Sequence, residues 1–176
     1  MIHFILGGAR SGKSSYGLEL AANYVAEGDE CLFVATAEAF DDEMACRIER
    51  HKIERDSGAL AWKTFECPLD LSECLTKQAK NGQVILVDCL TLWLTNHLLN
   101  PSSDWTQVKA DFLHALSTLP GRIILISNEV GTGVVPGDPL SRRFVDEAGW
   151  LHQAIAKLAD EVVLVTAGLP MRLKGK

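Results

Sequence analysis

Residues 1–14 read MIHFILGGARSGKS, an apolar run that breaks into a glycine-rich turn ending in Gly12-Lys13-Ser14. This is the spacing G-x-x-x-x-G-K-[ST] of a phosphate-binding loop. Glycine tolerates positive φ, so successive backbone N–H groups can converge on an anion. The pattern predicts that Lys13 reaches the β- and γ-phosphates of a nucleotide and that Ser14 binds Mg²⁺. The alternative is a glycine turn that binds nothing. The residues expected at the phosphates are Gly7, Gly8, Ala9, Arg10, Ser11, Gly12, Lys13 and Ser14.

Apolar runs and helical patterns alternate after this loop. The runs predict strands at 2–6, 31–36, 62–66, 83–89, 122–128 and 161–166, the last of which is expected to close the sheet. Helical periodicity predicts helices at 14–27, 41–56, 69–80, 90–99, 104–118 and 140–159. Continuously apolar strands that alternate with helices are typical of an α/β fold with a mostly parallel central sheet. With no repeat or linker, residues 1–176 are expected to form one domain.

Composition narrows the class of partner. The chain has 17 Lys and Arg against 23 Asp and Glu, a net charge of −6, which argues against a nucleic-acid partner. No apolar run approaches the ~18 residues that span a bilayer, and nothing resembles a signal peptide, so a cytoplasmic protein is expected. The five cysteines show no C-x-x-C spacing and are expected to be buried or half-buried thiols.

Two further features follow predicted strands. Asp88 ends the strand at 83–89, where α/β proteins bind ligands, and with the phosphate loop it is interpreted as the acid that holds Mg²⁺. Its alternative role is to cap the next helix. The glycine- and proline-rich segment 129–139 suits either an active-site lid or a plain surface connection.

The charged helix predicted at 41–56 contains a candidate nucleophile. Arg47, His51 and Arg55 are spaced four apart and would lie along one helix face. Neighbouring positive charges favour neutral imidazole, and the arginines could bind phosphate oxygens, so His51 could attack phosphorus. The alternative is a solvated histidine on an exposed helix.

Taken together, the motifs resemble those of the bifunctional adenosylcobinamide kinase/adenosylcobinamide-phosphate guanylyltransferase family, nearly from end to end. The similar residues are Gly7 to Ser14, Ala35-Thr36, Asp41 to Met44 with Arg47-Ile48 and His51-Lys52, Trp62 with Glu66, Asp88 to Trp93, Ser127 to Gly131, Val135-Pro136, Ala159 to Val162 and Gly168 to Pro170. The chain departs from the family pattern at Asp56, where proline is frequent, and between His51 and Trp62, which is a few residues longer.

The resemblance implies two reactions on one RecA-like P-loop domain. First, ATP or GTP phosphorylates the aminopropanol hydroxyl of adenosylcobinamide. Then GTP guanylylates a histidine, matched here by His51, with release of pyrophosphate, and GMP passes to adenosylcobinamide phosphate to give adenosylcobinamide-GDP. The resemblance also implies a homotrimer. It places at the guanine nucleotide Ala35, Thr36, Ala37, Lys52, Ile53, Glu54, Arg55, Glu66 and Asp88.

Two rival functions remain open at this point. One is a small-metabolite kinase in which His51 has no catalytic role. The other is a RecA-like nucleotide-binding module that regulates a partner, although the acidic balance of the chain gives it little support.

Overall fold

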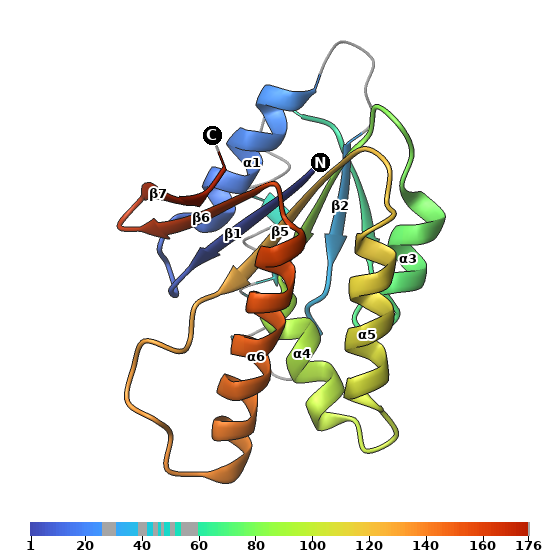
Figure 1. Cartoon of the computed structure of the whole chain (residues 1–176). Coiled ribbons are helices and arrows are strands. Elements are labelled where there is room, and N and C mark those ends of the chain that lie inside the picture. The colour runs from blue at the N-terminus through green and yellow to red at the C-terminus, as the bar shows by residue number, and fades with distance from the viewer. Residues whose placement is uncertain are drawn as a thin grey trace.

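A seven-stranded sheet forms the centre of the molecule, with strand order β3-β2-β4-β5-β1-β6-β7 (Figure 1). This computed structural model describes residues 1–25, 31–38, 42–43, 46, 48–49, 52–53 and 60–175. All neighbouring strands pair in parallel except β6 and β7. The strands are β1 (Ile2–Gly7), β2 (Cys31–Ala35), β3 (Trp62–Glu66), β4 (Val84–Asp88), β5 (Arg122–Asn128), β6 (Glu161–Thr166) and β7 (Leu169–Lys174).

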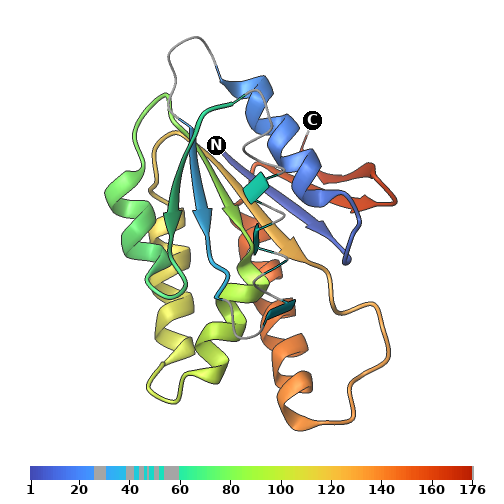
Figure 2. The same cartoon turned by 180° about the vertical axis from the view of Figure 1, so that it is seen from behind.

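Helices cover both faces of the sheet. Helix α1 lies on one face, and α3, α4, α5 and α6 lie on the other, as the two opposite views show (Figures 1 and 2). Their bounds are α1 (Lys13–Tyr24), α3 (Leu71–Gln78), α4 (Leu90–Leu99), α5 (Trp105–Leu116) and α6 (Pro139–Leu158). The mostly parallel sheet flanked by helices is the α/β architecture that the sequence predicts.

The central strands are apolar on both sides because both faces are covered. Every residue of β1 is buried, and its side chains alternate between two clusters. Phe4 packs in the cluster beneath α3 to α6, whereas Ile5 packs in the cluster beneath α1. Strand geometry explains this division, since successive side chains point to opposite faces.

The prediction that residues 161–166 close the sheet is wrong. Strand β7 pairs antiparallel with β6 and forms the edge. The two strands are joined by Ala167 and Gly168, whose φ angles of 51° and 78° suit a tight hairpin. All six residues of β7 are exposed, so the strand lacks the apolar signal by which the buried strands were predicted.

The boundaries of α3, α4, α5 and α6 agree with the prediction to within two residues. Helix α1 begins at Lys13 and ends at Tyr24, followed by the extended Val25, whereas the prediction placed its end at residue 27. In the segment predicted as a helix at 41–56, residues 42–43, 46, 48–49 and 52–53 are helical. The remainder of that segment, including Arg47, His51, Glu54 and Arg55, lies outside the described residues.

The cysteine prediction needs one correction. Cys31, Cys67 and Cys89 are buried and Cys74 is half-buried, as expected, but Cys46 is exposed. Its segment carries mostly charged side chains, so its helix offers little apolar surface to bury a thiol. In the part of the chain that the structure describes, no helix is both long enough and apolar enough to cross a membrane.

Candidate active site

The turn between β1 and α1 has the backbone of an anion-binding loop. Arg10 and Gly12 both adopt left-handed conformations, with φ of 56° and 93°. Gly12 is the N-cap of α1 and has no side chain that could cap the first N–H groups of that helix. A phosphate at this position would meet both free N–H groups and the positive end of the helix dipole.

Glycine is required at both ends of the loop for steric reasons. A Cβ on Gly7 would lie 2.7 Å from the carbonyl oxygen of Val165. A Cβ on Gly12 would lie 3.1 Å from the Cα of Gly168, in the turn between β6 and β7. The N–H of Gly168 also donates to the carbonyl oxygen of Ser11 at 2.8 Å, so the edge hairpin braces the phosphate loop.

Two polar side chains of the loop are positioned to meet a ligand. Lys13 is 9% exposed, and its Nζ donates to the carbonyl oxygen of Gly8 at 3.2 Å. The Ser11 hydroxyl is buried and finds no hydrogen-bond partner among the described residues. An unpartnered buried hydroxyl is costly, and a phosphate oxygen would satisfy it.

The two predicted metal ligands meet although they are 74 residues apart in the chain. Ser14 Oγ donates to Asp88 Oδ2 at 2.8 Å. A hydroxyl and a carboxylate are the hard oxygen ligands that Mg²⁺ prefers, so this pair fits the cation. The described residues include no group of three or more His, Cys, Asp or Glu that could hold a metal. Mg²⁺ is commonly held by one or two protein oxygens together with water and substrate phosphates, so two protein ligands suffice to hold it.

Strand register brings three predicted nucleotide-binding residues into one row. Ala35 at the end of β2 pairs with Glu66 on β3 and with Asp88 on β4. Thr36 follows in the wall of the site, fully buried, and its hydroxyl donates to the carbonyl oxygen of Cys89 at 2.7 Å. The next residue, Ala37, is half-buried.

The described part of the charged segment reaches this row of strand ends. Lys52 Nζ lies 3.4 Å from Glu66 Oε1, and both side chains are substantially exposed to solvent, at 35% and 71%. Ile53 is 62% exposed. The structure thus brings Lys52 and Glu66 together, while His51, Glu54 and Arg55 lie outside the described residues.

Asn128, Thr91 and Cys89 form a polar cluster next to Asp88 that was not predicted as part of the site. The side-chain amide of Asn128, at the end of β5, donates to Thr91 Oγ1 at 2.8 Å. Burial raises the pKa of the neighbouring Cys89 thiol to about 11, so this cysteine stays protonated at neutral pH. Asn128 and Cys89 lie in segments that are similar to the family, 127–131 and 88–93. That similarity is the sequence signal that could have identified them.

A buried serine on β5 lies next to a buried histidine on α6. Ser127 Oγ and His152 Nε2, on α6, are 2.8 Å apart. Burial lowers the pKa of His152 to about 4, although the negative charge of Glu129 acts in the opposite direction. The imidazole is therefore neutral at pH 7 and pins α6 to the carboxyl end of β5.

Proteins with solved structures share the fold. The flagellar accessory protein FlaH from Methanocaldococcus jannaschii superposes with a TM-score of 0.54 at 13% identity, covering 99% of this chain and 78% of FlaH. A second solved structure, an ATPase domain, gives 0.53 at 15% identity, covering 93% of this chain and 68% of that domain. These similarities establish a RecA-like P-loop fold and no more than the fold.

Proteins with similar sequences identify the family as well as the fold. The bifunctional adenosylcobalamin biosynthesis protein CobP of Pseudomonas aeruginosa is 51% identical over 177 residues, covering 100% of this chain and 99% of CobP. Its counterpart CobU of Salmonella typhimurium is 34% identical over 188 residues, covering 99% and 100%. The model of the family described as cobinamide kinase / cobinamide phosphate guanyltransferase matches residues 3–173. This chain therefore belongs to the family of bifunctional cobinamide kinases and cobinamide phosphate guanyltransferases.

Proposed function

We propose that this protein phosphorylates the aminopropanol hydroxyl of adenosylcobinamide with ATP or GTP and then adds GMP from GTP to adenosylcobinamide phosphate. The products of the second reaction are adenosylcobinamide-GDP and pyrophosphate. Family membership over the whole chain supports the proposal. The observation that carries it in the structure is the contact between Ser14 and Asp88 beside a phosphate loop, the arrangement that a triphosphate with its cation requires.

The kinase half rests on the phosphate loop. The N–H groups of residues 7–14 and the Lys13 ammonium stabilise the negative charge of the transferring phosphoryl group, which is where most of the catalysis of phosphoryl transfer lies. Ser14 and Asp88 would hold Mg²⁺, and the cation would supply positive charge that neutralises the charge developing on the phosphates. Lys13 is already preorganised, since its Nζ is held over the loop by Gly8.

The transferase half assigns covalent catalysis to His51. A ring nitrogen attacks the α-phosphorus of GTP, the bond to the pyrophosphate oxygen breaks, and pyrophosphate leaves with the electron pair. A phosphate oxygen of adenosylcobinamide phosphate then attacks the same phosphorus and frees the histidine. In this proposal Lys52, Ile53, Glu54, Arg55 and Glu66 line the guanine nucleotide, together with Ala35 to Ala37 and Asp88. The ion pair between Lys52 and Glu66 supports the grouping.

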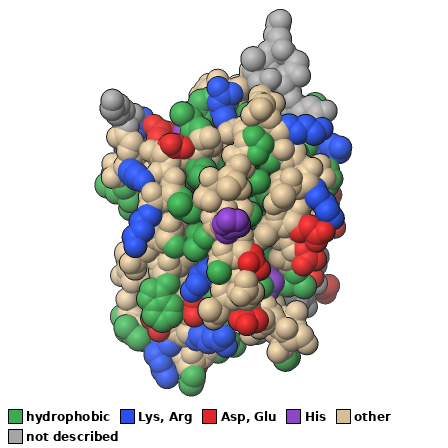
Figure 3. Space-filling view, turned by 45° about the vertical axis from the view of Figure 1, so that its right-hand side comes forward, with side chains coloured by type: hydrophobic (Ala, Val, Ile, Leu, Met, Phe, Trp, Pro, Cys, Tyr) green, Lys and Arg blue, Asp and Glu red, His purple; other side chains and the backbone are tan. Residues whose placement is uncertain are grey.

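The surface is consistent with small-molecule partners. On the face drawn in Figure 3, Lys and Arg side chains are interspersed with acidic and apolar ones. A nucleic-acid site gathers basic side chains along one stripe or patch. The acidic net charge of −6 points the same way, so we propose no nucleic-acid partner.

Incubation with α-labelled GTP tests the transferase half. The wild-type protein should acquire a label that is acid-labile and base-stable, as expected for a phosphoramidate on histidine. His51→Asn should not be labelled, whereas His114→Asn, which changes an exposed histidine on α5, should be labelled like wild type. Labelling of His51→Asn at the wild-type level would overturn the assignment.

The proposal also covers domain organisation, oligomeric state and cellular location. We propose that residues 1–176 act as one domain, that three copies associate, and that the protein works in the cytoplasm. Light scattering coupled to size-exclusion chromatography tests the trimer directly, and a monomeric or dimeric mass would contradict it.

A further inference from the structure

The proposed kinase reaction needs a group that accepts the proton of the attacking hydroxyl. The strand order indicates where that group must be. Lys13 follows β1, whereas the cation ligand Asp88 ends β4, and β5 lies between these two strands. A γ-phosphate held from both sides therefore lies over the carboxyl end of β5.

Asn128 is the last residue of β5, and Glu129 follows it. Asn128 pairs with Gly7 in the sheet, and its amide donates to Thr91; an amide is not a proton acceptor at neutral pH. Glu129 extends the pairing, because its N–H donates to the carbonyl oxygen of Gly7 at 3.0 Å. Its backbone thus lies beside the first residue of the phosphate loop, and its side chain is half-buried.

The other described carboxylates at or just beyond the strand ends of this edge are less suitable. Asp88 already accepts the hydroxyl of Ser14 and is assigned to the cation. Glu66, on β3, is 71% exposed and paired with Lys52, and Glu38 follows β2; both strands lie beyond β4 from the loop. Glu129, the first residue after β5, is the described carboxylate that follows the strand adjacent to the loop.

We propose that Glu129 is the general base of the kinase step, an inference that rests on the proposed function. Glu129 Oε1 accepts a hydrogen bond from the N–H of Gly131 at 2.5 Å, so the proton goes to Oε2. The substrate oxygen forms a bond to the γ-phosphorus while the bond to the β–γ bridging oxygen breaks, and the nucleoside diphosphate leaves with that electron pair. Glu129 later releases the proton to water.

Glu129→Gln separates this role from a structural one. The glutamine amide oxygen can still accept the hydrogen bond from Gly131, but it cannot take up a proton. We expect the kinase kcat to fall by about 100-fold or more, with the KM for nucleotide unchanged. Labelling of the variant by α-labelled GTP, which involves no hydroxyl proton, should remain at the wild-type level. Glu38→Gln is the matched control and should leave both activities unchanged.

Three outcomes would overturn the assignment: a wild-type kcat in Glu129→Gln, an equal loss of kinase activity and labelling, or loss of kinase activity in Glu38→Gln alone. If Glu129→Gln does not fold, Glu129→Ala is assayed with added formate, which should restore kinase turnover if a carboxylate base is what is missing; no restoration in a folded variant counts against the proposal. Failure of the proposed function shows differently, as wild-type protein that does not phosphorylate adenosylcobinamide at all.

Discussion

His152 illustrates how one buried side chain links stability to pH. It lies 8% exposed on α6, within hydrogen-bond distance of Ser127 Oγ and against the ring of Phe4. Burial holds its pKa at about 4, below the ordinary value of 6.5. Between these two values the unfolded chain binds a proton that the folded protein does not, so the free energy of unfolding must fall as the pH falls.

We expect acidification from about pH 7 to about pH 4 to remove about 3 kcal/mol of stability through this group. Burial lowers the pKa of His3 and His97 as well, which adds to the loss in the same direction. His152→Gln should therefore flatten the dependence of unfolding free energy on pH, measured by urea denaturation across this range. The exposed His114→Gln is the control, and an equally flat profile for it would contradict the assignment.

Lys13 should be required for both reactions because both begin with a triphosphate in the same loop. We expect Lys13→Ala to lower kinase turnover and guanylylation together, each by about 100-fold or more. Lys80→Ala, at an exposed position after α3, should affect neither. Steady-state kinetics and GTP labelling of the same preparations measure the two effects. Loss of one activity alone would mean that the loop does not serve both.

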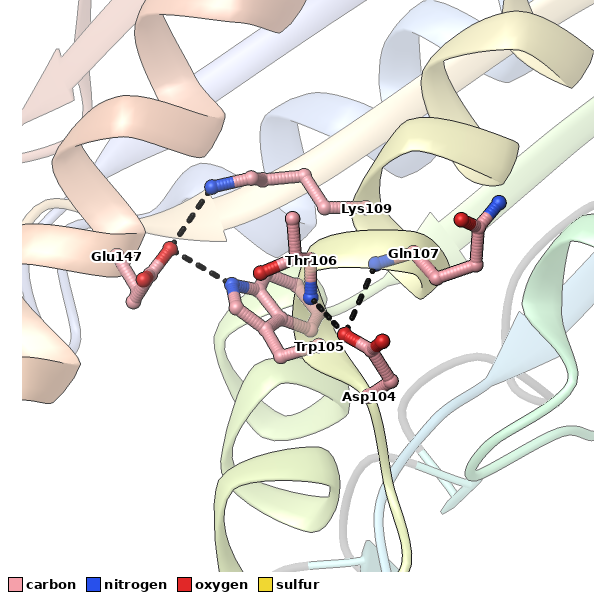
Figure 4. Close-up of polar contacts among 6 residues, drawn as sticks. All are labelled: Asp104, Trp105, Thr106, Gln107, Lys109 and Glu147. Atoms are coloured by element: carbon pink, nitrogen blue, oxygen red, sulfur yellow. Dashed lines mark hydrogen bonds and ion pairs between the residues drawn. The ribbon is translucent and has the colours of Figure 1, made fainter.

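A carboxylate on α6 binds two side chains of α5. Glu147 Oε2 accepts from Trp105 Nε1 at 2.7 Å and from Lys109 Nζ at 2.8 Å (Figure 4). Figure 4 also shows Asp104 capping α5 through the N–H groups of Thr106 and Gln107. Trp105 is 3% exposed, so its indole N–H depends on this acceptor.

Removing the Glu147 side chain should lower the free energy of unfolding more than removing only its negative charge. Glu147→Ala leaves the buried indole N–H unsatisfied and should lower the unfolding free energy by about 1–3 kcal/mol. Glu147→Gln keeps an acceptor for Trp105 and loses only the ion pair with Lys109, so its loss should be smaller. Urea denaturation compares the two, and equal stabilities would show that the indole bond contributes nothing.

The approach of α1 to the sheet depends on Gly17. A Cβ at this position would lie 2.8 Å from Ile126 Cδ1 and 3.4 Å from Leu86 Cδ1. Gly17→Val should therefore destabilise the protein by about 1–3 kcal/mol through overpacking. Gly149, within α6, has open space around it, so Gly149→Ala should instead stabilise by about 0.5–1 kcal/mol. Thermal unfolding measures both, and a shift of the same sign for the two variants would contradict this account.

Elements of the fold were predictable where burial requires a run or a periodic pattern of apolar residues in the sequence. The strands at 122–128 and 161–166 have the predicted bounds, because strands buried on both faces are apolar over most of their length. The strand at 62–66 and the helix at 90–99 also have the predicted bounds. The exposed strand β7 carries no such pattern and was missed. Sequence motifs identified the loop and Asp88 separately, but strand order decides which ends are neighbours. The row of Ala35, Glu66 and Asp88, and the place of Glu129 next to Gly7, became visible only in the folded chain.

The arrangement of one phosphate loop in this sheet predicts competition between the two reactions. Both donors would occupy the loop of residues 7–14 with the cation at Ser14 and Asp88. In a preparation whose kinase reaction uses ATP, the β,γ-imido analogue of ATP should therefore inhibit labelling by α-labelled GTP competitively. Removal of divalent cations with EDTA should stop both reactions, and added Mg²⁺ should restore them.

Inhibition that excess GTP fails to relieve, or no inhibition at all, would require a second triphosphate site. The measurement is the initial rate of labelling at several concentrations of GTP and analogue, with Lys80→Ala as a control that should show the wild-type inhibition constant. Competitive inhibition follows from the geometry, because the N–H groups of one loop, braced by Gly168 at its back, can hold the phosphates of one nucleotide at a time.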